Sequence, residues 1–326
     1  MTQQQTQHHQ TTSSIVATRN QDATFANDEI DLRELFSTIW AGKWLIILIT
    51  AFFAVSGVVY SLLQPNIYKS ETVLVPASQN GQSGLAGMAA QFGGLASLAG
   101  INLNSGGSDD TAIALATLES RQFINYFINK HNLLVPLMAS KNWNQDTGKL
   151  NLDGQLYDSD NEVWIRDVEP PKSVEPSEWE SYEEFKNEVM SISQAKDTGL
   201  VTVTVTHHSP LIAQRWATLL VEDLNAWMKD KSLADTKRNI NYLVKQLEKT
   251  AKTEMQTVFY QLIEEQTKQL MLSELEEEFS FKTIDPAVVP EEKTGPKRAL
   301  ICVLTTLLGG MLGVFIVLIR HFVKKS

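Results

Sequence analysis

Two long stretches without a charged residue constrain this chain more than any other feature. Residues 44–63 read WLIILITAFFAVSGVVYSLL, and residues 299–319 read ALICVLTTLLGGMLGVFIVLI. Each is about 20 residues long, the length at which a helix crosses the hydrocarbon core of a bilayer. The sequence therefore predicts one transmembrane helix near each end of the 326 residues, with a large domain between them.

Charges beside these stretches predict the orientation of the chain. The outer flanks carry Arg19, Arg33 and Lys43 on one side and Arg320, His321, Lys324 and Lys325 on the other. Short basic flanks stay in the cytoplasm, whereas long loops such as the one that ends in Lys297 and Arg298 are exempt. We expect both termini in the cytoplasm, two passes through the inner membrane of a Gram-negative bacterium, and the main domain in the periplasm. A signal peptide is the weaker interpretation of 44–63, because over 40 residues precede it and no small-x-small cleavage site follows.

The net charge of −10 is concentrated in one stretch. Residues 146–188 contain 13 Asp and Glu residues against four Lys and Arg residues. An acidic surface repels phosphate backbones, which argues against nucleic acid as a partner. We expect a solvated face here. The single cysteine, Cys302, lies inside the second apolar stretch, so we expect no intrachain disulfide and no thiolate zinc site.

Small residues in the apolar stretches indicate helix packing. Gly309 and Gly313 form a GxxxG pair with Gly310 between them, and such pairs let two helix backbones approach closely. Residues 57–61 offer a weaker face, with Gly at the first position and Ser at the last. We expect helix–helix contact; the alternative is that Gly is simply common in membrane helices.

The segment before the first span divides in two. Residues 1–27 are rich in Gln and Thr and lack apolar periodicity, which predicts a disordered cytoplasmic tail. In residues 28–43, apolar side chains at 32, 35, 36, 39 and 40 follow helical spacing. They predict an amphipathic juxtamembrane helix that lies on the inner leaflet and leads into the span.

Residues 64–208 predict an α/β base. Tyr68–Val75 has the composition of a strand, and 188–194 with 200–206 predict a hairpin in which Val alternates with Thr. One helix is expected from Ser108 to about Lys130. Residues 81–107 contain eight Gly and match no phosphate-binding loop. We expect a flexible loop there, or a small-residue apolar loop packed near the membrane or between subunits.

Residues 141–180 are polar and acidic and contain Pro, which predicts mostly loop. Trp143, Trp164 and Trp179 are expected to pin this loop to the core. Stacking on sugar rings is the alternative role for these three side chains.

Residues 209–284 predict a long helical segment. Ser209 and Pro210 suit its start, and neither Gly nor Pro occurs in the 74 residues from Leu211 to Ile284. One straight helix would be about 110 Å long at about 1.5 Å per residue. Apolar residues continue along it at near-heptad spacing, so it needs a partner to cover them. Thr253-x-x-Gln256 matches a capping box, which predicts a turn near 249–253 and a helical hairpin.

Three prolines follow this segment. Pro286, Pro290 and Pro296 predict an extended, stiff connector over 285–298. The second span at 299–319 and a cytoplasmic tail at 320–326 complete the chain.

No catalytic, cofactor-binding or metal-binding constellation stands out. Residues 146–188 hold enough carboxylates for a glycan hydrolase, but a Pro-containing polar stretch does not fix them in position. His207 and His208 lack the neighbouring Cys, Asp or Glu residues of a metal site. A periplasmic sensor is a further alternative, but cytoplasmic parts of about 43 and 7 residues are too short for an output domain. We expect no enzymatic activity and no cofactor.

Four stretches resemble the Wzz chain-length determinants, the polysaccharide co-polymerases of Gram-negative inner membranes. They are DEIDLRELFSTIWAGKWLI (28–46), SDDTAIALATLESRQFI (108–124), TGLVTVTVTHHSPLIAQRWATLLVEDLN (198–225) and KTIDPAVVPEEKTGPKRALICVLTTLLGGMLG (282–313). With the matching topology, the resemblance covers nearly the whole chain. The Gly-rich segment 81–107 departs from the best-known members.

The resemblance implies an α+β membrane protein. Two transmembrane helices would flank a periplasmic domain with a membrane-proximal α/β base and a long α-helical hairpin. It implies a closed homo-oligomeric ring that controls the length of an undecaprenyl-linked polysaccharide made by a Wzy-type polymerase. O-antigen lipopolysaccharide is the expected glycan; capsule, exopolysaccharide or an enterobacterial-common-antigen-like glycan is the alternative. We find no Walker motif, so the kinase domain of the capsule branch is not expected.

Seven residues are the candidates for functional roles. They are expected to set how the last helix of the domain is coupled to the second span and to neighbouring subunits. The candidates are Pro286, Pro290, Pro296, Lys297, Gly309, Gly310 and Gly313.

Overall fold

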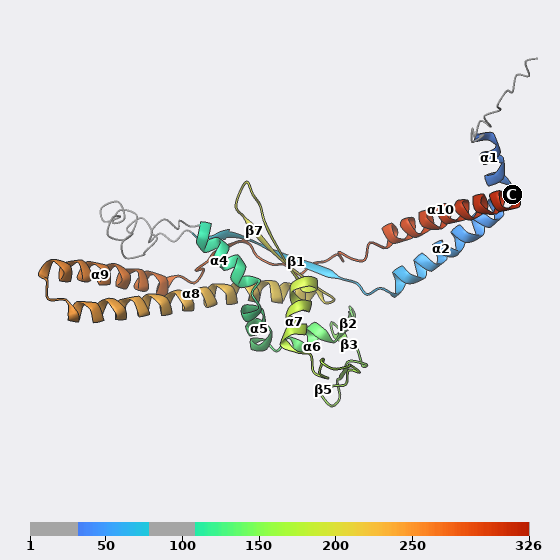
Figure 1. The fold of residues 1–326 in the computed structure, drawn as a ribbon. Helices are drawn as coiled ribbons and strands as arrows, with labels where there is room; N and C mark the ends of the chain where they lie inside the picture. The colour runs from blue at the N-terminus through green and yellow to red at the C-terminus, as the bar shows by residue number, and fades with distance from the viewer. Residues whose placement is uncertain (1–31, 78–107, 326) are drawn as a thin grey trace, which may run out of the picture. The chain divides into compact units, whose positions relative to one another are not determined.

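The computed structural model describes residues 32–77 and 108–325. Its elements run from α1 to α10 in the order drawn in Figure 1. The chain divides into two compact units, Met1–Ser56 with Val303–Ser326 and Gly57–Cys302. The predicted tail at 1–27, the start of the amphipathic segment at 28–31 and the Gly-rich segment 81–107 lie outside the described residues.

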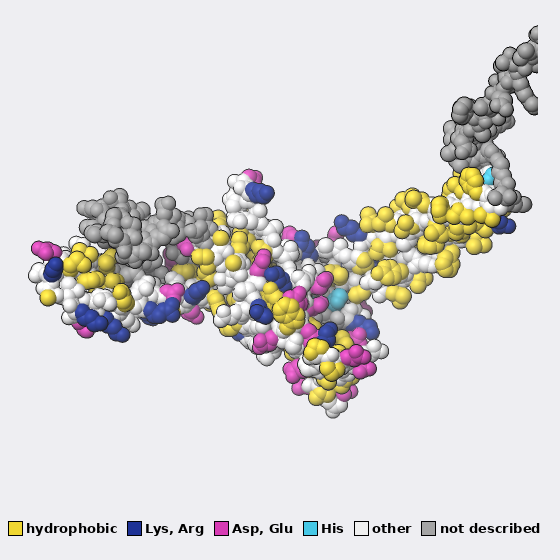
Figure 2. All heavy atoms as spheres, in the orientation of Figure 1, with side chains coloured by type: hydrophobic (Ala, Val, Ile, Leu, Met, Phe, Trp, Pro, Cys, Tyr) yellow, Lys and Arg dark blue, Asp and Glu magenta, His cyan; other side chains and the backbone are white. Residues whose placement is uncertain are grey.

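Three helices carry the apolar ends of the chain. They are α1 (Leu32–Ala41), α2 (Lys43–Leu63) and α10 (Arg298–Lys325). Helices α2 and α10 are each long and apolar enough to cross a membrane, and only 11% and 17% of their apolar windows are buried. Other protein covers the core helix of a soluble domain, whereas these two expose a nearly continuous apolar surface (Figure 2). Such a surface is typical of helices that contact lipid.

The described part of the amphipathic segment is α1. Phe36 and Trp40 lie exposed on it, and their rings stack with centroids 6.2 Å apart. The Nζ atom of Lys43 lies 4.9 Å from the centroid of the Trp40 ring. An exposed aromatic pair beside a cation suits a membrane–water interface.

The second unit contains a four-stranded antiparallel sheet in the order β6–β7–β1–β8. Its strands are β1 (Tyr68–Pro76), β6 (Met190–Gln194), β7 (Val201–His207) and β8 (Phe281–Asp285). β1 pairs with β7 from Tyr68 opposite His207 to Leu74 opposite Val201, and its other edge pairs with β8. The strand that follows α2 is therefore held on both sides by segments from far later in the sequence.

The strand predictions are confirmed at Tyr68–Val75 and in the β6–β7 hairpin. Gly199 has a φ of +70° in the turn of that hairpin, a conformation that Gly adopts without strain. The first hairpin strand begins at Met190, because residues 185–189 form the π-helix η1 (Phe185–Val189) instead.

One hydrophobic core lies between the sheet and the helices packed on it. Val201, Val203 and Val205 of β7 are fully buried, as the Val/Thr alternation predicted. The other large side chains with almost no exposed surface are Leu74, Leu118, Phe123, Ile124, Phe127, Phe185, Leu220, Leu224 and Phe281. Together with the three valines they come from β1, α4, α5, η1, β7, α8 and β8, so the core joins distant parts of the sequence.

The single helix predicted over 108–130 is wrong. Two helices occur, α4 (Ser108–Leu118) and α5 (Arg121–Lys130). Ser120 begins α5 as its N-cap, and its Oγ accepts a hydrogen bond from the backbone N of Phe123 at 3.2 Å. The break lets α5 turn four apolar side chains, at 123, 124, 127 and 128, into the core.

Residues 134–184, which we call the acidic insertion, are more regular than the predicted loop. They form α6 (Leu134–Met138), two short hairpins and α7 (Glu178–Glu184). The hairpins pair β2 (Ser140–Trp143) with β3 (Leu150–Leu152) and β4 (Tyr157–Asp158) with β5 (Val163–Trp164). Most residues of 141–180 lie outside helices and strands, as predicted, and the hairpins are too short to leave a clear periodicity in the sequence.

The long helical segment is a hairpin of α8 (Pro210–Lys249) and α9 (Thr253–Leu275), which lie side by side in Figure 1. The turn at 250–252 agrees with the predicted position. With the exception of Thr236, the buried residues of α8 all lie between Pro210 and Asn225, and α9 has none. The root of α8 therefore belongs to the core, whereas among the described residues the rest of the hairpin has one buried side chain, that of Thr236.

The capping signals at the two helix starts fail in detail. Ser209 is the N-cap of α8 and Pro210 follows at N1, but the Ser209 side chain makes no capping hydrogen bond. The capping box predicted at Thr253 is wrong, because Lys252 is the N-cap of α9 and no side chain caps that end. Gln256 instead donates from Nε2 to the carbonyl of Thr250 across the turn, at 2.7 Å.

Helical structure ends at Leu275 and does not continue to 284, contrary to the predicted 209–284 segment. Lys229 of α8 donates from Nζ to the carbonyls of Glu274 and Glu276, at 2.9 and 2.8 Å. A cation at the C-terminus of a helix satisfies its last carbonyls and opposes its dipole. The chain then enters β8, and its first residue, Phe281, is fully buried.

A buried amide on α8 holds this returning strand. Asn225 donates from Nδ2 to the carbonyl of Phe281 at 2.9 Å. Its Oδ1 accepts from the backbone N of Ser280 and of Phe281, at 2.8 and 3.0 Å. The side chain therefore satisfies backbone groups that a helix would otherwise have paired, which is why 280–285 can leave the helical course.

An ion pair holds the same helix to α5. The Asp223 carboxylate is buried and lies 2.7 Å from Nζ of Lys130 and 2.8 Å from Nε2 of His131. Its hydrogen bond raises the pKa of Lys130 above the usual value. The root of α8 is thus fixed both to β8 and to α5.

We predict that Asn225→Ala loosens β8. The substitution leaves the backbone groups of Ser280 and Phe281 buried without partners, at a cost of about 1–3 kcal/mol. Amide hydrogen exchange across 278–287 should therefore be roughly 5- to 150-fold faster.

Asn241→Ala is the matched control, because Asn241 lies exposed on the same helix. Mass-spectrometric exchange of the full chain in detergent measures both variants. Equal exchange in the two would contradict the role of the Asn225 amide.

Candidate functional site

The glycines of α10 pack against α2 of the same chain. A Cβ atom at Gly309 would lie 2.6 Å from Cβ of Phe53, and one at Gly313 would lie 3.1 Å from Cα of Ile46. Real Cβ atoms essentially never approach a heavy atom within 3.0 Å, so any larger residue at 309 must push the helices apart. The GxxxG pattern therefore marks a real helix–helix contact, and its partner is α2.

Gly310 lies differently from its neighbour. A Cβ atom there would meet one atom within 4 Å, Oγ1 of Thr50 at 3.8 Å, which is ordinary van der Waals distance. The structure thus separates two adjacent glycines, one of which is required for close packing and one of which is not.

The sequence prediction missed Gly42. A Cβ atom there would lie 2.5 Å from Cγ1 of Val317. Gly42 precedes Ile46 by four residues and Val317 follows Gly313 by four, so one further helical turn extends the contact on both helices. That spacing is the signal that could have found it. We call the contacting residues 42, 46, 50 and 53 with 309, 313 and 317 the glycine seam.

A second set of contacts joins the residues that follow α2 to those that precede α10. Asn66 accepts at Oδ1 from Nη2 of Arg298 and Nζ of Lys293, both at 3.2 Å. The backbone N of Ile67 donates to the carbonyl of Gly295 at 3.0 Å, and the carbonyl of Ile67 accepts from the backbone N of Thr294 at 2.8 Å. These residues form a junction where the chain enters and leaves the second unit. In the sequence, the signal for this junction is Asn66, a hydrogen-bonding side chain placed just after the apolar stretch 44–63.

The connector packs on the sheet along part of its length. Ser70 of β1 donates from Oγ to the carbonyl of Val288 at 2.7 Å, and Thr72 donates to that of Asp285 at 3.0 Å. Gln214 of α8 donates to the carbonyl of Ala287 at 3.2 Å. The prolines leave these carbonyls unpaired within the connector itself, and side chains of β1 and α8 satisfy them.

The candidate prolines and Lys297 occupy different surroundings. Pro286 and Lys297 are exposed, whereas Pro290 and Pro296 are partly buried. Lys297 accepts a hydrogen bond at its backbone carbonyl from the N of Ile301, one turn into α10.

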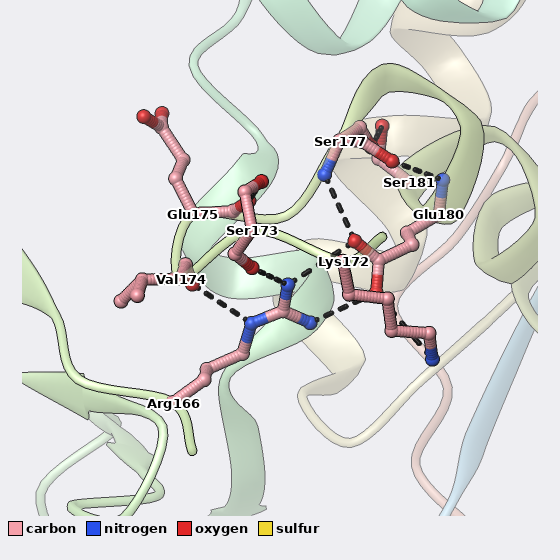
Figure 3. Close-up of polar contacts among 8 residues, drawn as sticks. All are labelled: Arg166, Lys172, Ser173, Val174, Glu175, Ser177, Glu180 and Ser181. Atoms are coloured by element: carbon pink, nitrogen blue, oxygen red, sulfur yellow. Dashed lines mark hydrogen bonds and ion pairs between the residues drawn. The ribbon is translucent and has the colours of Figure 1, made fainter. Parts of the chain in front are cut away.

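The most tightly bonded polar group in the acidic insertion is Arg166 (Figure 3). Its Nη1 and Nη2 atoms donate to the two carboxylate oxygens of Glu180, each at 3.1 Å. Its Nε and Nη2 also donate to the carbonyls of Val174 and Ser173, at 2.9 and 2.8 Å. One guanidinium thus ties the 173–175 segment to α7.

Glu180 also belongs to the N-terminal cap of α7. Ser177 Oγ accepts from the N of Glu180 at 3.2 Å, and the Glu180 carboxylate accepts from the N of Ser177 at 3.1 Å. Ser177-x-x-Glu180 is thus a capping box that the sequence contained and the prediction missed.

The charge of Glu180 follows from these partners. Hydrogen bonds from Arg166 lower the pKa of its carboxyl from 4.5 to about 2, against the effect of burial. A carboxyl that stays ionised at neutral pH does not donate a proton, so Glu180 is unsuited to be the general acid of a glycan hydrolase.

His207, the last residue of β7, has a structural role. His207 is buried, its Nε2 lies 3.0 Å from the carbonyl of Pro136, and its Nδ1 accepts from the N of Ser209 at 3.0 Å. Burial lowers the pKa of His207 to about 4, which keeps it neutral. Among the described residues, no three His, Cys, Asp or Glu side chains gather as a metal site requires.

The three tryptophans of the acidic insertion differ in their contacts. Trp143 meets Tyr68 of β1 edge-on at 5.7 Å, so it does pin the insertion to the sheet. Trp164 meets Tyr157 within the insertion at 5.1 Å. The prediction is wrong for Trp179, which is 56% exposed and lies beneath the guanidinium of Arg121.

Sequence models of protein families match two regions of the chain. Residues 28–131 match the chain length determinant protein family, Wzz. Residues 241–322 match a family described as a G-rich domain on putative tyrosine kinases, and this region includes all three glycines of α10. Together the matches span more than half of the chain.

The chain belongs to the Wzz chain-length-determinant family. Solved structures similar to this Wzz chain include a full-length bacterial polysaccharide co-polymerase, with 14% identity and a TM-score of 0.39 over 91% of this chain and 99% of that one. A fragment of WzzB, the polysaccharide co-polymerase from Salmonella Typhimurium, has 13% identity and a TM-score of 0.32 over 71% and 100%. No curated protein sequence matches. The family assignment rests on the sequence models alone.

We predict that Gly309→Ala disturbs the glycine seam of this Wzz chain and that Gly310→Ala does not. Overpacking against Phe53 should cost about 1–3 kcal/mol and move α2 from α10. Spin labels at the exposed positions Leu48 and Met311, in a Cys302→Ser background, measure the separation of the helices. Equal shifts in the two variants would contradict the assignment of Gly309 as the contact.

We predict that the Glu180 ion pair stabilises the acidic insertion only above a defined pH. Because the pKa is lowered on folding, the contribution is complete above about pH 4.5 and is lost as the pH falls toward about 2. Glu180→Gln should therefore lower the melting temperature at pH 6 and have little effect near pH 2.5.

Near-ultraviolet circular dichroism, which follows the tryptophans, is the measurement. Glu169→Gln, at an exposed site in the same stretch, is the control and should show no such pH-dependent loss. A constant difference between Glu180→Gln and the parent at every pH would contradict the ion-pair explanation.

Proposed function

We propose that this Wzz chain is a non-enzymatic regulator of surface polysaccharide chain length, of the O-antigen lipopolysaccharide type. It acts as an oligomeric co-polymerase with a Wzy-type polymerase and sets where growth of an undecaprenyl-linked glycan stops. The match of residues 28–131 to the chain length determinant family is the observation that carries the proposal. Capsule, exopolysaccharide or an enterobacterial-common-antigen-like glycan is the alternative cargo.

The proposed location is the inner membrane, with both termini in the cytoplasm and residues 64–298 in the periplasm. The uncovered apolar surfaces of α2 and α10 support two passes through a bilayer. Basic residues outside both spans support this orientation. The junction at Asn66 is consistent with a domain that begins and ends at one membrane surface.

The proposed assembly is a closed ring of identical subunits. No residue of α9 is buried, and the hairpin exposes large apolar side chains at Tyr242, Tyr260, Met271 and Leu275. A long helical hairpin with uncovered apolar residues is stabilised by a neighbour that covers them. We therefore assign contact between copies to this hairpin. Gly309 and Gly313 were predicted to contact neighbouring copies; we assign them instead to the glycine seam within each copy.

The seven candidate residues then act through the membrane end of each subunit. Gly309 and Gly313 hold the two spans together, while the connector from Pro286 through Pro296 to Lys297 fixes the path from β8 into α10. Separation of the spans would alter how each subunit stands in the bilayer, and thereby the geometry that the polymerase meets.

We predict that Gly309→Leu with Gly313→Leu abolishes length control. Expressed in the source bacterium without its chromosomal copy, the double variant should give a gel ladder without a modal band, because leucine at both positions forces the spans apart. Gly310→Leu is the matched control and should keep the band, because a single atom lies within 4 Å of its Cβ position.

Two results would overturn parts of the proposal. An unchanged modal band in the double variant, at equal protein level, would remove the seam from the mechanism. Release of shorter glycan fragments by purified protein would overturn the non-enzymatic assignment.

A further inference from the structure

The acidic insertion contains an open hollow of about 520 Å³, which lies in the size range of about 300–1,000 Å³ typical of small-ligand sites. It lies between the start of α6 and the β4–β5 hairpin. Its polar lining includes Asn132, Glu162 and Glu175, and its aromatic lining is Tyr157 and Trp164. Val163 and Val174, each about half exposed, complete an apolar rim.

Two backbone conformations at this hollow are unusual. Among the described residues, Asn132 and Glu162 are the two non-glycine residues with positive φ, at +53° and +55°, and both line the hollow. Asn132 follows the end of α5, where Asn commonly adopts this conformation. Glu162 ends the β4–β5 turn, a position at which Gly would be free of strain.

A glutamate at positive φ is less favourable than a glycine would be, so the conformation of Glu162 needs support from its surroundings. Backbone strain of this kind persists where the surrounding structure enforces it, and such residues concentrate at functional sites. Asp158 enforces the turn here, because its carboxylate accepts from the backbone N of Asp160 and of Asn161, at 2.9 and 3.2 Å. The turn therefore holds Glu162 at the rim of the hollow.

The opposite wall is fixed as well. Arg166 bonds to the carbonyls of Val174 and Ser173, and Ser173 Oγ donates to the carbonyl of Glu175 (Figure 3). Because Arg166 is also paired with Glu180, its charge is not available to a ligand. The hollow is therefore pre-formed, with a rigid segment facing a strained turn.

The chemistry of the lining selects a ligand class. Glu162 and Glu175 line the hollow, Asp158 and Asp160 lie in the adjoining turn, and none of the described residues that line it is Lys or Arg. Figure 2 shows apolar side chains surrounded by acidic ones over this part of the chain. Phosphate and carboxylate ligands would be repelled. Two rings that meet at a steep angle, with carboxylates and an amide beside them, suit a pyranose ring with hydroxyl or amino substituents.

We infer that this hollow is a saccharide-binding site that prefers neutral sugars and sugars with a free amino group over acidic ones. Trp164 stacks on the apolar face of the ring, and Glu162 and Glu175 accept hydrogen bonds from its hydroxyl or ammonium groups. The inference rests on the proposed function for the origin of the sugar, which would be the growing glycan. It adds a point of contact between that glycan and the base of each subunit.

Binding is tested with the full chain in detergent on an array of one- to four-residue oligosaccharides that includes neutral hexoses, N-acetylated and free amino sugars, and uronic acids. We expect binding to neutral and amino sugars and none to uronic acids. Trp164→Leu should weaken binding at least tenfold. Trp179→Leu is the matched control and should change it less than twofold, because Trp179 does not line the hollow.

Two further variants keep the test decisive if Trp164→Leu unfolds. Glu162→Gly should raise or preserve the melting temperature, because it relieves the positive φ, and still weaken binding at least threefold. Glu162→Gln with Glu175→Gln should weaken the rejection of uronic acids, because the two carboxylates that repel them are gone.

Three outcomes would overturn the inference: no binding on the array, binding unchanged by every hollow variant, or Trp164-dependent binding of a lysine-rich peptide in place of any sugar. The gel ladder separates this result from the proposed function. If no sugar binds while Gly309→Leu with Gly313→Leu still abolishes the modal band, the saccharide site fails and length control stands.

Discussion

The pairing of β1 with the returning chain is the interaction on which the second unit depends. β1 follows α2 almost at once, and β8 with the connector leads directly into α10. A chain with an apolar helix at each end must bring its two domain boundaries together if both helices enter the same bilayer. The antiparallel run of β1 beside β8 does this, and it is extended by the backbone hydrogen bonds of Ile67 with Gly295 and Thr294 and by side-chain hydrogen bonds from Ser70 and Thr72. The elements from α4 to α9, including the hairpin of α8 and α9, lie between these two strands in the sequence.

Sequence patterns predicted the parts of this fold that are set by local periodicity. The two long apolar helices, β1 and the β6–β7 hairpin lie where hydrophobic spacing or turn residues indicated. The turn near 250 also lies where it was predicted, although the capping box that indicated it does not form. The errors fall where a single distant contact overrides a local pattern. Residues 281–285 have no helix breaker before Pro286, yet Phe281 is drawn into the core and Asn225 replaces its helical hydrogen bonds. Nothing in the sequence near 281 records a partner 56 residues earlier.

The residues of the candidate site also fall into those that a local sequence pattern predicts and those that it does not. The Gly309 and Gly313 pattern was visible, because a four-residue spacing of glycines has a direct meaning for helix packing. Its partner was not visible, since Phe53 and Ile46 are ordinary residues of an apolar helix, and Gly42 lies just outside the predicted span. The Arg166–Glu180 pair has no local signal in the sequence, because the two residues lie 14 positions apart in a stretch that contains 13 carboxylates. A solvated acidic face and a pre-formed hollow have the same composition and differ in which carboxylates have fixed partners.

The division of α8 into a buried root and a solvent-exposed remainder has a mechanical consequence. Its 40 residues form one rod of about 60 Å at about 1.5 Å per residue. A small tilt of α8 moves the residues near Trp216 and Leu220 only slightly and leaves their packing intact. The same tilt moves the far end of the helix several times as far. In the proposed ring, the spacing between the tips of neighbouring subunits would thus depend on the side chains that pack around the base of α8. Conservative changes deep in the base could alter the diameter of an assembly while every residue at its rim stays the same.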